Sequence, residues 1–259
     1  MCADKTDIAN SVNREGGLLF DRALLPQARP DMLDPAHWQA QTEQSRGGRG
    51  AVWMLSGPFG AGVLRHYRRG GMAARVSRDT YLWRGAEQTR SFAEFRLLLR
   101  MRELGLPVPR PILAGYQRVA PLRYRADLLM SRIENSHSLA ERLGQAQIEG
   151  LSVESLGLDS LGHTLARFHC AGIDHADLNA HNLLQDTSGS WWVIDFDRGK
   201  IRQPQRHWIK QRLLRLRRSI NKVLAANHKR AEACWRSLRA AHDCAAPEYQ
   251  WRGPADEQP

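Results

Sequence analysis

The most restrictive stretch of this sequence is a polar loop, followed along the chain by a short apolar run that ends in acidic residues. The loop reads His175-Ala176-Asp177-Leu178-Asn179-Ala180-His181-Asn182. Thirteen residues after Asn182, the chain reaches Asp195-Phe196-Asp197, directly after the apolar run Trp192-Val193-Ile194. Taken singly, such residues are common turn formers, helix caps and strand ends. Their joint order and spacing are far more specific, and a fold that uses them together must bring the loop to the end of a strand.

This pattern resembles the catalytic loop of kinases, H-x-D-L-x-x-x-N, followed by a D-F-G-like metal motif. Phosphoryl transfer needs a carboxylate beside the attacking hydroxyl and separate oxygens that hold Mg2+ against the nucleotide phosphates. Asp177 is therefore the expected catalytic residue, which orients the hydroxyl and accepts its proton. Asn182 and Asp195 are the expected metal ligands, because hard oxygens suit Mg2+. His175 is interpreted as a structural member of the loop, and the role of His181 is left open.

Upstream of the loop, the sequence offers candidates for a nucleotide site. In kinases a glycine-rich loop covers the phosphates, a basic residue stands on the third strand, and a Glu stands on the next helix. Gly48 and Gly50 are the expected loop residues, although Trp53 occupies the place of the third Gly. Arg65 is the expected basic residue in place of the usual Lys, and it can grip two phosphate oxygens at once. Glu94 is its expected partner; the alternative is a surface Arg and a surface Glu.

Hydrophobic patterns and turn signals predict where the regular elements lie. Residues 51–55 and 62–67 are the predicted strands of a hairpin, because Gly57-Pro58-Phe59-Gly60 between them is a strong turn signal. A helix is predicted at 90–104, with Ser91 as its N-cap. The remaining predictions are a strand at 124–133, a buried helix at 160–171, a strand at 191–196, and one or two long helices at 205–242.

This order of elements predicts an α+β protein with a protein-kinase-like bilobal fold, in which a small antiparallel β N-lobe precedes a reduced, mostly helical C-lobe. The expected division is an irregular leader at 1–35, the N-lobe at 36–133, the catalytic core of the C-lobe at 134–204, its basic helical region at 205–245, and a tail at 246–259. Ala176 replaces the Arg of regulated protein kinases, and only 62 residues follow Asp197. The acceptor is therefore expected to be a small molecule or a lipid-linked sugar rather than a protein.

Further strings within residues 35–225 carry a more specific pattern. They are Gly48-Arg49-Gly50, Leu64-Arg65-His66-Tyr67-Arg68-Arg69-Gly70-Gly71, Tyr81-Leu82-Trp83, Leu106-Pro107-Val108-Pro109-Arg110-Pro111, Tyr124-Arg125-Ala126-Asp127-Leu128-Leu129 and Asp195-Phe196-Asp197-Arg198-Gly199. Together they resemble the 3-deoxy-D-manno-octulosonic acid (Kdo) kinases of the lipopolysaccharide kinase group. The resemblance implies phosphorylation of the 4-hydroxyl of Kdo on a lipid A precursor, with ATP and Mg2+ as cofactors and Asp177 as the catalytic residue. It also implies attachment to the cytoplasmic face of the bacterial inner membrane.

The chain is strongly basic, with 38 Lys and Arg against 27 Asp and Glu and a formal net charge of +11. That charge alone permits nucleic acid, an anionic membrane surface or a phosphorylated substrate as partner. One cluster of cations lies near the expected nucleotide strand, and it either contacts ATP phosphate and the acidic sugar or forms a solvated charge run. Its members are Arg65, Arg68, Arg69, Arg75 and Arg78.

The second basic segment is 205–242, where apolar residues such as Trp208 and Leu213 alternate with cations. The apolar residues either pack on the catalytic lobe or help the segment to meet anionic headgroups. The four cysteines are scattered with no C-x-x-C pair, which favours a reducing compartment. The sequence shows no signal peptide and no membrane-spanning run, so a cytoplasmic protein held peripherally at the membrane is expected.

Two competing functions stay open. A related kinase-like phosphotransferase acting on heptose or another small hydroxyl acceptor would share Asp177, Asn182 and Asp195. A nucleic-acid-binding protein on a degenerate kinase scaffold fits the charge, but no nucleic-acid motif is recognised, and the acidic groups repel phosphate unless metal is bound. The expected partners are therefore the Kdo–lipid A precursor and the anionic membrane surface, with no nucleic acid and no obligate protein partner.

Overall fold

The chain forms two compact units in the computed structural model, which describes residues 6–38, 41–43, 52–68 and 79–250. The β-rich unit comprises residues 1–100 and 109–132, and the helical unit comprises residues 101–108 and 133–259. The α+β class is therefore confirmed. Several residues singled out in the sequence lie outside the described residues, namely Gly48, Gly50, Arg69, Arg75 and Arg78.

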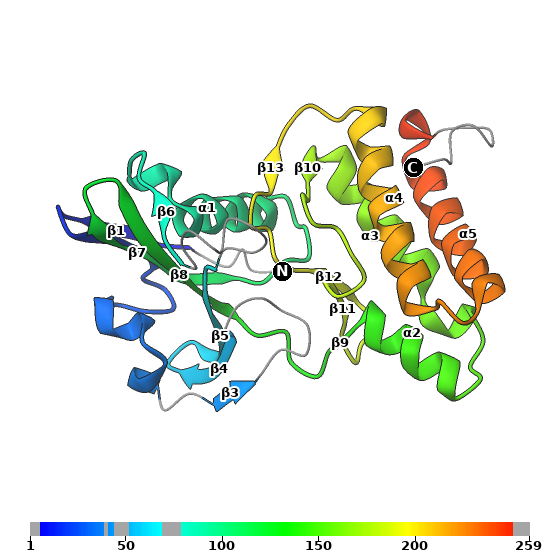
Figure 1. The fold of residues 1–259 in the computed structure, drawn as a ribbon, viewed down its shortest axis with the longest axis horizontal. Helices are drawn as coiled ribbons and strands as arrows, with labels where there is room; N and C mark the ends of the chain where they lie inside the picture. The colour runs from blue at the N-terminus through cyan, green and yellow to red at the C-terminus, as the bar shows by residue number, and fades with distance from the viewer. Residues whose placement is uncertain (1–5, 39–40, 44–51, 69–78, 251–259) are drawn as a thin grey trace. The chain divides into compact units, whose positions relative to one another are not determined.

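Within the described residues, the β-rich unit is built on one eight-stranded sheet in which every strand pair is antiparallel. The order across the sheet is β1-β2-β7-β8-β5-β4-β3, with β6 paired to β8 beside this path (Figure 1). The strands are β1 Ile8–Val12, β2 Gly16–Asp21, β3 Gln41–Glu43, β4 Val52–Gly57, β5 Gly60–His66, β6 Tyr81–Leu82, β7 Pro111–Ala120 and β8 Arg123–Ser131.

The prediction of an irregular leader at 1–35 is wrong, because β1 and β2 form a hairpin that extends the sheet. In β2 all of Leu18, Leu19 and Phe20 are buried, so the strand shows a continuous apolar run instead of the alternation that identifies a half-exposed strand. The irregular part is limited to the proline-rich stretch after it, which forms short 3-10 helices at Pro30–Leu33 and Pro35–Trp38.

The predicted N-lobe also includes residues 101–108, which the structure assigns to the helical unit. Two contacts explain the assignment. The Val193 N–H donates to the Pro107 carbonyl at 3.0 Å, and Arg167 Nη2 donates to the Gly105 carbonyl at 2.6 Å. Both partners of this segment therefore lie far along the chain, in the second unit.

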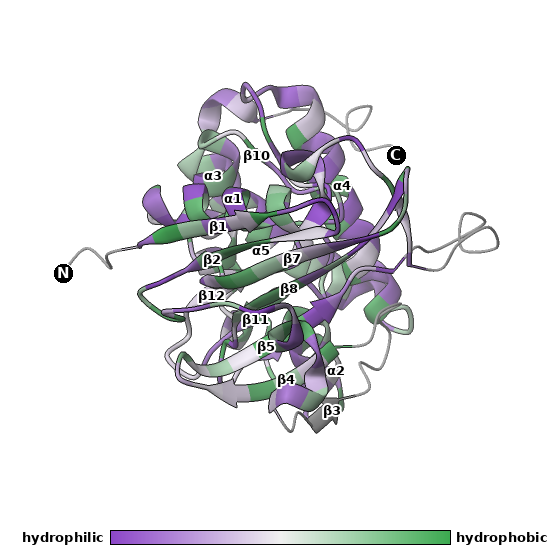
Figure 2. Ribbon diagram, turned by 90° about the vertical axis from the view of Figure 1, so that its left-hand side faces the viewer, coloured by the Kyte–Doolittle hydropathy of each residue, from purple (hydrophilic) through white to green (hydrophobic). Residues whose placement is uncertain are grey.

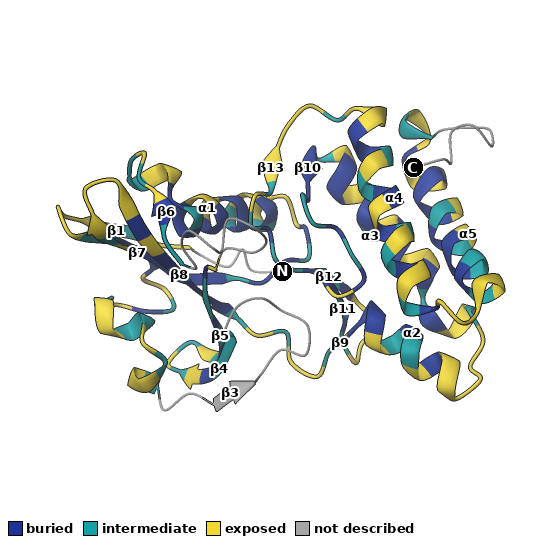
Figure 3. Cartoon of the chain, viewed as in Figure 1, coloured by how far each residue is buried: buried dark blue, intermediate teal, exposed yellow. Residues whose placement is uncertain are grey.

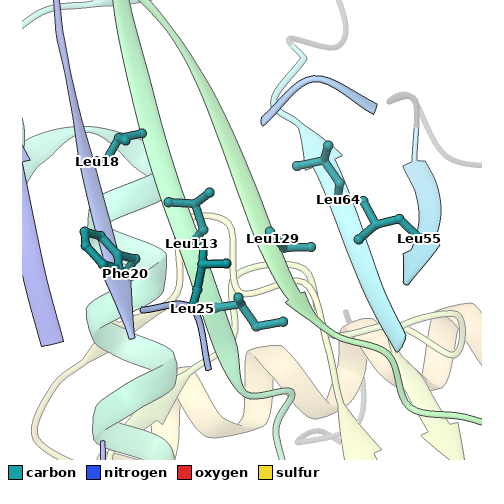
Figure 4. Packing of buried hydrophobic residues seen from close by; sticks show 8 residues of the cluster. Leu18, Phe20, Leu25, Leu55, Leu64, Leu113 and Leu129 are labelled. Atoms are coloured by element: carbon teal, nitrogen blue, oxygen red, sulfur yellow. The ribbon is translucent and has the colours of Figure 1, made fainter. Parts of the chain in front are cut away.

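The core of the β-rich unit is a cluster of large aliphatic and aromatic side chains from five strands and the segment after β2 (Figure 4). Its buried members are Leu18, Phe20, Leu25, Leu55, Leu64, Ile112, Leu113 and Leu129. Burial of each such side chain stabilises the fold by roughly 1.5–3 kcal/mol. The strands that carry this core show as green stretches in the hydropathy view (Figure 2).

The predicted hairpin and the first helix are both confirmed. β4 and β5 pair through a two-residue connection at Pro58 and Phe59, and the turn ends at Gly60 with φ +85°. Helix α1 runs over Arg90–Glu103. The prediction of Ser91 as N-cap is wrong, because Ser91 lies inside the helix and its hydroxyl donates to the Gly115 carbonyl at 2.8 Å.

Four helices dominate the described part of the second unit, accompanied by short strands (Figure 1). The helices are α2 Leu139–Ile148, α3 Leu158–Cys170, α4 Arg206–Val223 and α5 His228–Ala245. The strands are β9 His137–Ser138, β10 Ile173–Asp174, β11 Leu183–Gln185, β12 Trp191–Val193 and β13 Lys200–Ile201. Helix α2 begins with a capping box, in which Ser138 and Glu141 exchange side-chain-to-backbone hydrogen bonds.

Helices α4 and α5 each bury one face and expose the other (Figure 3). On α4 the apolar side chains are the buried ones, among them Trp208, Leu213 and Ile220. The interpretation that this stripe packs on the catalytic lobe is thus confirmed for α4. Among the described helices, none has both the length and the apolar character needed to cross a membrane.

Helices α3 and α5 approach each other closely at Gly162. A Cβ built at Gly162 would lie 2.3 Å from the Leu238 carbonyl oxygen, whereas a Cβ at Gly144 in α2 would meet nothing within 4 Å. We expect Gly162→Ala to lower the free energy of unfolding by about 1–3 kcal/mol, since the helices must separate. Gly144→Ala is the matched control and should raise it by about 0.5–1 kcal/mol through helix propensity. Urea unfolding measures both, and equal shifts in the two variants would contradict the close approach.

Candidate active site

A buried ion pair joins strand β5 to helix α1 in the β-rich unit. Arg65 Nη2 donates to Glu94 Oε2, and the two side chains are 16% and 2% exposed. The Tyr67 hydroxyl donates to the same carboxylate oxygen at 2.6 Å, and the Arg65 guanidinium lies 4.7 Å from the centre of the Tyr67 ring. The structure thus brings Arg65 and Glu94 together, and it adds Tyr67, which was not predicted as a site residue.

The loop at 175–182 in the helical unit, which is predicted to be catalytic, is held in place by His175. This histidine is buried, its Nε2 lies 2.9 Å from the Ile194 carbonyl oxygen, and its Nδ1 accepts from the Asp177 N–H at 3.2 Å. A proton on Nε2 and none on Nδ1 satisfies both contacts, which is the neutral imidazole. Burial lowers the pKa of His175 in agreement with that form. The histidine therefore ties the loop to the chain that follows β12.

The backbone around Asp177 is fixed by two asparagines. Asn179 Nδ2 and Asn182 Nδ2 donate to the Asp177 carbonyl at 2.9 and 3.0 Å, and the Ile194 N–H donates to the Asn182 carbonyl at 3.0 Å. Asn182 is buried, and its amide nitrogen is occupied by this bond, so its Oδ1 is the atom left to face a cation. The Asp177 side chain itself is 49% exposed and can be reached by a substrate.

The chain leaves the strand earlier than predicted, because β12 ends at Val193 and Asp195 adopts φ +62°. This left-handed conformation is uncommon for a residue with a side chain and persists only where its surroundings impose it. The following Phe196 is buried, stacks on Phe168 at 6.0 Å, and lies 4.7 Å from the His175 ring. Packing of Phe196 therefore fixes the turn that carries Asp195. The residue before it, Ile194, is the one bonded to Asn182.

The donor set at this place suits Mg2+. Asn182 Oδ1 and the Asp195 carboxylate are hard oxygens, and Mg2+ in phosphoryl-transfer sites is held by one or two such groups, with waters and substrate phosphates completing its shell. Across the described ranges, no three His, Cys, Asp or Glu side chains gather as a metal site. A cation here would therefore depend on the nucleotide for its remaining ligands.

Two ion pairs made by α4 were missed in the sequence, because they join residues 38 positions apart. Arg212 Nε lies 2.5 Å from Asp174 Oδ1, and Arg202 Nη1 lies 3.0 Å from Asp174 Oδ2. Burial alone would raise the pKa of Asp174, but the hydrogen bonds and charges of Arg212 and Arg202 hold it below its usual value. On the same helix, Arg215 Nη2 donates to Asp177 Oδ1.

The chain matches the sequence model of the lipopolysaccharide kinase (Kdo/WaaP) family over residues 36–242. It belongs to this family. A 3-deoxy-D-manno-octulosonic acid kinase of Stenotrophomonas maltophilia is 53% identical over 209 residues, which cover 80% of this chain and 81% of that protein. The enzyme of the same name from Xanthomonas campestris pv. campestris is 52% identical over the same shares. The resemblance predicted from the sequence is confirmed.

A solved structure shows the same fold. "WaaP in complex with acyl carrier protein" superposes with a TM-score of 0.56 at 14% identity, and the match covers 84% of each chain. The kinase-like fold expected for the lipopolysaccharide kinase family is therefore confirmed. The placement of catalytic, nucleotide-binding and metal-binding roles on single residues stays a prediction.

The buried histidines make the stability of this kinase sensitive to acid. Burial lowers the pKa of His169 and His175, so the unfolded chain, with histidines near 6.5, binds more protons below that pH. Their stabilisation is complete above pH 6.5 and is lost as the pH falls. We therefore expect the urea concentration at the midpoint of unfolding to decrease as the pH is lowered from 7.5 to about 5. Tryptophan fluorescence measures the unfolding.

His66 provides the control for this pH dependence. Its hydrogen bond with Asp127, at 2.6 Å, raises the pKa of His66, so its stabilisation is present at low pH and is lost as the pH rises above about 6.5. His66→Gln should therefore keep the loss of stability in acid or deepen it. A wild-type midpoint that stays constant or rises in acid would contradict the prediction.

Proposed function

We propose that this protein is an ATP-dependent Kdo kinase that phosphorylates the 4-hydroxyl of Kdo on a lipid A precursor. The observation that carries the proposal is Asp177, a half-exposed carboxylate on a loop fixed by His175 and Asn182. The chain that carries it is 53% and 50% identical to two enzymes named 3-deoxy-D-manno-octulosonic acid kinase. A polar, accessible acid on a rigid loop is what a kinase needs to position an attacking hydroxyl.

In the proposed reaction, the acceptor hydroxyl attacks the γ-phosphorus of ATP. A new oxygen–phosphorus bond forms while the bond to the bridging oxygen breaks, ADP leaves, and the hydroxyl proton passes to Asp177. Asn182 and Asp195 would hold Mg2+, which neutralises charge on the nucleotide phosphates when bound. Because His175 and Asn179 fix the loop, the Asp177 carboxylate needs little reorganisation to meet the hydroxyl.

The β-rich unit would bind the nucleotide. Arg65 is the proposed phosphate ligand, since its guanidinium is held by Glu94 and stays charged at any physiological pH. Glu94 is proposed to act through Arg65, by orienting it. Gly48 and Gly50 are proposed to line the loop over the phosphates.

Mass analysis of the product tests the function. With ATP, Mg2+ and a Kdo–lipid A precursor, the wild type should add one phosphate per acceptor, and a heptose-containing acceptor without Kdo should stay unmodified. Asp177→Asn should lower kcat by about 100- to 10,000-fold, because the proton acceptor is lost. Asp159→Asn, which replaces an exposed carboxylate at the start of α3, is the matched control and should keep full activity. Phosphate transfer to heptose alone, or full turnover by Asp177→Asn, would refute the assignment.

We further propose that the protein attaches peripherally to the inner membrane through the exposed cations of α4. Since the apolar stripe of α4 is buried, attachment there would be electrostatic, through residues such as Arg218 and Lys222. Each cation near an anionic surface contributes about 1 kcal/mol. The absence of an obligate protein partner stays a prediction, as does the absence of nucleic acid.

Vesicle sedimentation tests this surface. The double variant Arg218→Glu/Lys222→Glu should bind phosphatidylglycerol vesicles at least about tenfold more weakly than the wild type at low salt. Arg84→Glu/Arg123→Glu carries the same charge change on exposed positions of the β-rich unit, and it should keep most of the binding. Equal losses in the two variants would mean that net charge alone, and not α4, governs attachment.

A further inference from the structure

Arg215 is the cation beside the proposed catalytic carboxylate, and the fold places it there. It lies on α4, whose buried face, including Leu213 and Leu216, packs into the helical unit. The Ala180 N–H donates to Ser219 Oγ at 3.0 Å, so the catalytic loop is bonded to α4 one turn beyond Arg215. The contact of Arg215 with Asp177 therefore joins two segments that are already fixed to each other.

The loop itself supplies no cation, because residues 175–182 contain neither Lys nor Arg. The positive charge next to Asp177 comes from α4 instead. In the described part of the chain, Nη2 is the guanidinium nitrogen that bonds to Asp177, and it contacts Oδ1. Nη2 carries two N–H donors, and the one that does not bond to Asp177 can act together with a neighbouring N–H of the guanidinium to bind a second anion, while Asp177 Oδ2 receives a hydroxyl.

The exposure of this pair separates it from its neighbour on the same helix. Arg212 contacts Asp174, whose side chain is only 5% exposed, so that pair is part of the interior. Arg215 and Asp177 are 46% and 49% exposed. Ion pairs at such exposure are weak, typically about 0–1 kcal/mol, and a substrate can exchange with them at little cost.

From this geometry we propose that Arg215 binds the carboxylate of the acceptor sugar and so orients its hydroxyl toward Asp177. The inference rests on the proposed function and extends it by naming a specificity residue. Because Arg215 contacts Asp177, an acceptor whose hydroxyl binds Asp177 also lies beside Arg215. The acidic sugar carries a carboxylate that can reach the guanidinium from there. Arginine and carboxylate form paired, parallel hydrogen bonds that fix orientation as well as position.

Steady-state kinetics on two soluble acceptors test the proposal: a Kdo glycoside, and the same glycoside with a neutral carboxamide in place of the carboxylate. For the acid, Arg215→Ala should lower kcat/KM by about tenfold to a hundredfold, mainly through the acceptor KM, while the KM for ATP stays unchanged. For the wild type, kcat/KM on the carboxamide should be lower than on the acid by a similar factor. On the carboxamide, wild type and Arg215→Ala should then be alike. Arg215→Lys should recover part of the loss on the acid.

The controls keep the outcomes apart. Arg236→Ala removes an exposed arginine from α5 and should match the wild type on both acceptors, and the urea midpoint of Arg215→Ala should equal that of the wild type. If Arg215→Ala lowers kcat/KM equally on the acid and on the carboxamide, the inference is overturned. Arg215 would then act on the phosphoryl group or on Asp177. An unchanged kcat/KM on the acid would also overturn the inference. If the wild type turns over neither glycoside, the Kdo–lipid A precursor and its carboxamide replace them, and no turnover of these either would overturn the proposed function.

Discussion

The neutral imidazole of His175 is the contact on which the candidate site depends. It joins the Ile194 carbonyl, at the start of the acidic turn, to the Asp177 N–H in the loop, and its ring also packs on Phe196. A protonated ring has two donors and no acceptor, so it would lose the bond from the Asp177 N–H. The same burial that lowers the pKa of His175 therefore keeps the loop and the turn in register. The geometry of the candidate loop and the expected acid sensitivity therefore have one cause.

The positive charge of the chain is divided by burial more than by position in the sequence. Arg65, Arg212 and Arg110 each meet a carboxylate that is almost fully buried, and breaking such a pair leaves a charge in the interior at a cost of several kcal/mol. Arg110 and Arg212 are held in the interior in this way and are not the cations that a polyanion meets, whereas Arg65 is the one of the three that is proposed to contact the nucleotide phosphates. The exposed cations of α4 are among those that can meet lipid or the acceptor. A net charge of +11 is thus a poor measure of the surface that a partner meets.

Spacing along the chain predicts those loops, hairpins and helices that are determined by local backbone geometry and local sequence pattern. The loop around Asp177, the β4–β5 hairpin, and the helix that carries Glu94 follow from local turns and periodicity, and the sequence places them well. The β1–β2 hairpin was missed because its partner strand β7 lies about a hundred residues away along the chain, and a buried run such as Leu18-Leu19-Phe20 has no alternation. Tyr67 and Arg215 were missed as site residues because only the folded chain brings them to Glu94 and Asp177. The capping box at Ser138 was also not predicted, although its S-x-x-E pattern is a local signal that lies within one turn of helix.

Asp174 and Asp177 show how this fold gives two nearby carboxylates different tasks. Asp174 ends β10, is buried, and is held by two arginines, which keep its pKa low and its side chain in one place. Three residues later Asp177 keeps half of its surface and a single arginine contact through one oxygen. Because Arg212 and Arg215 lie one turn apart on α4, one helix holds the first carboxylate in the interior and still leaves the second accessible. A kinase needs both conditions, since the carboxylate that accepts the proton must be fixed in direction and yet open to a substrate. The burial of Asp174 anchors the chain just before the loop, so Asp177 can stay exposed without losing its orientation.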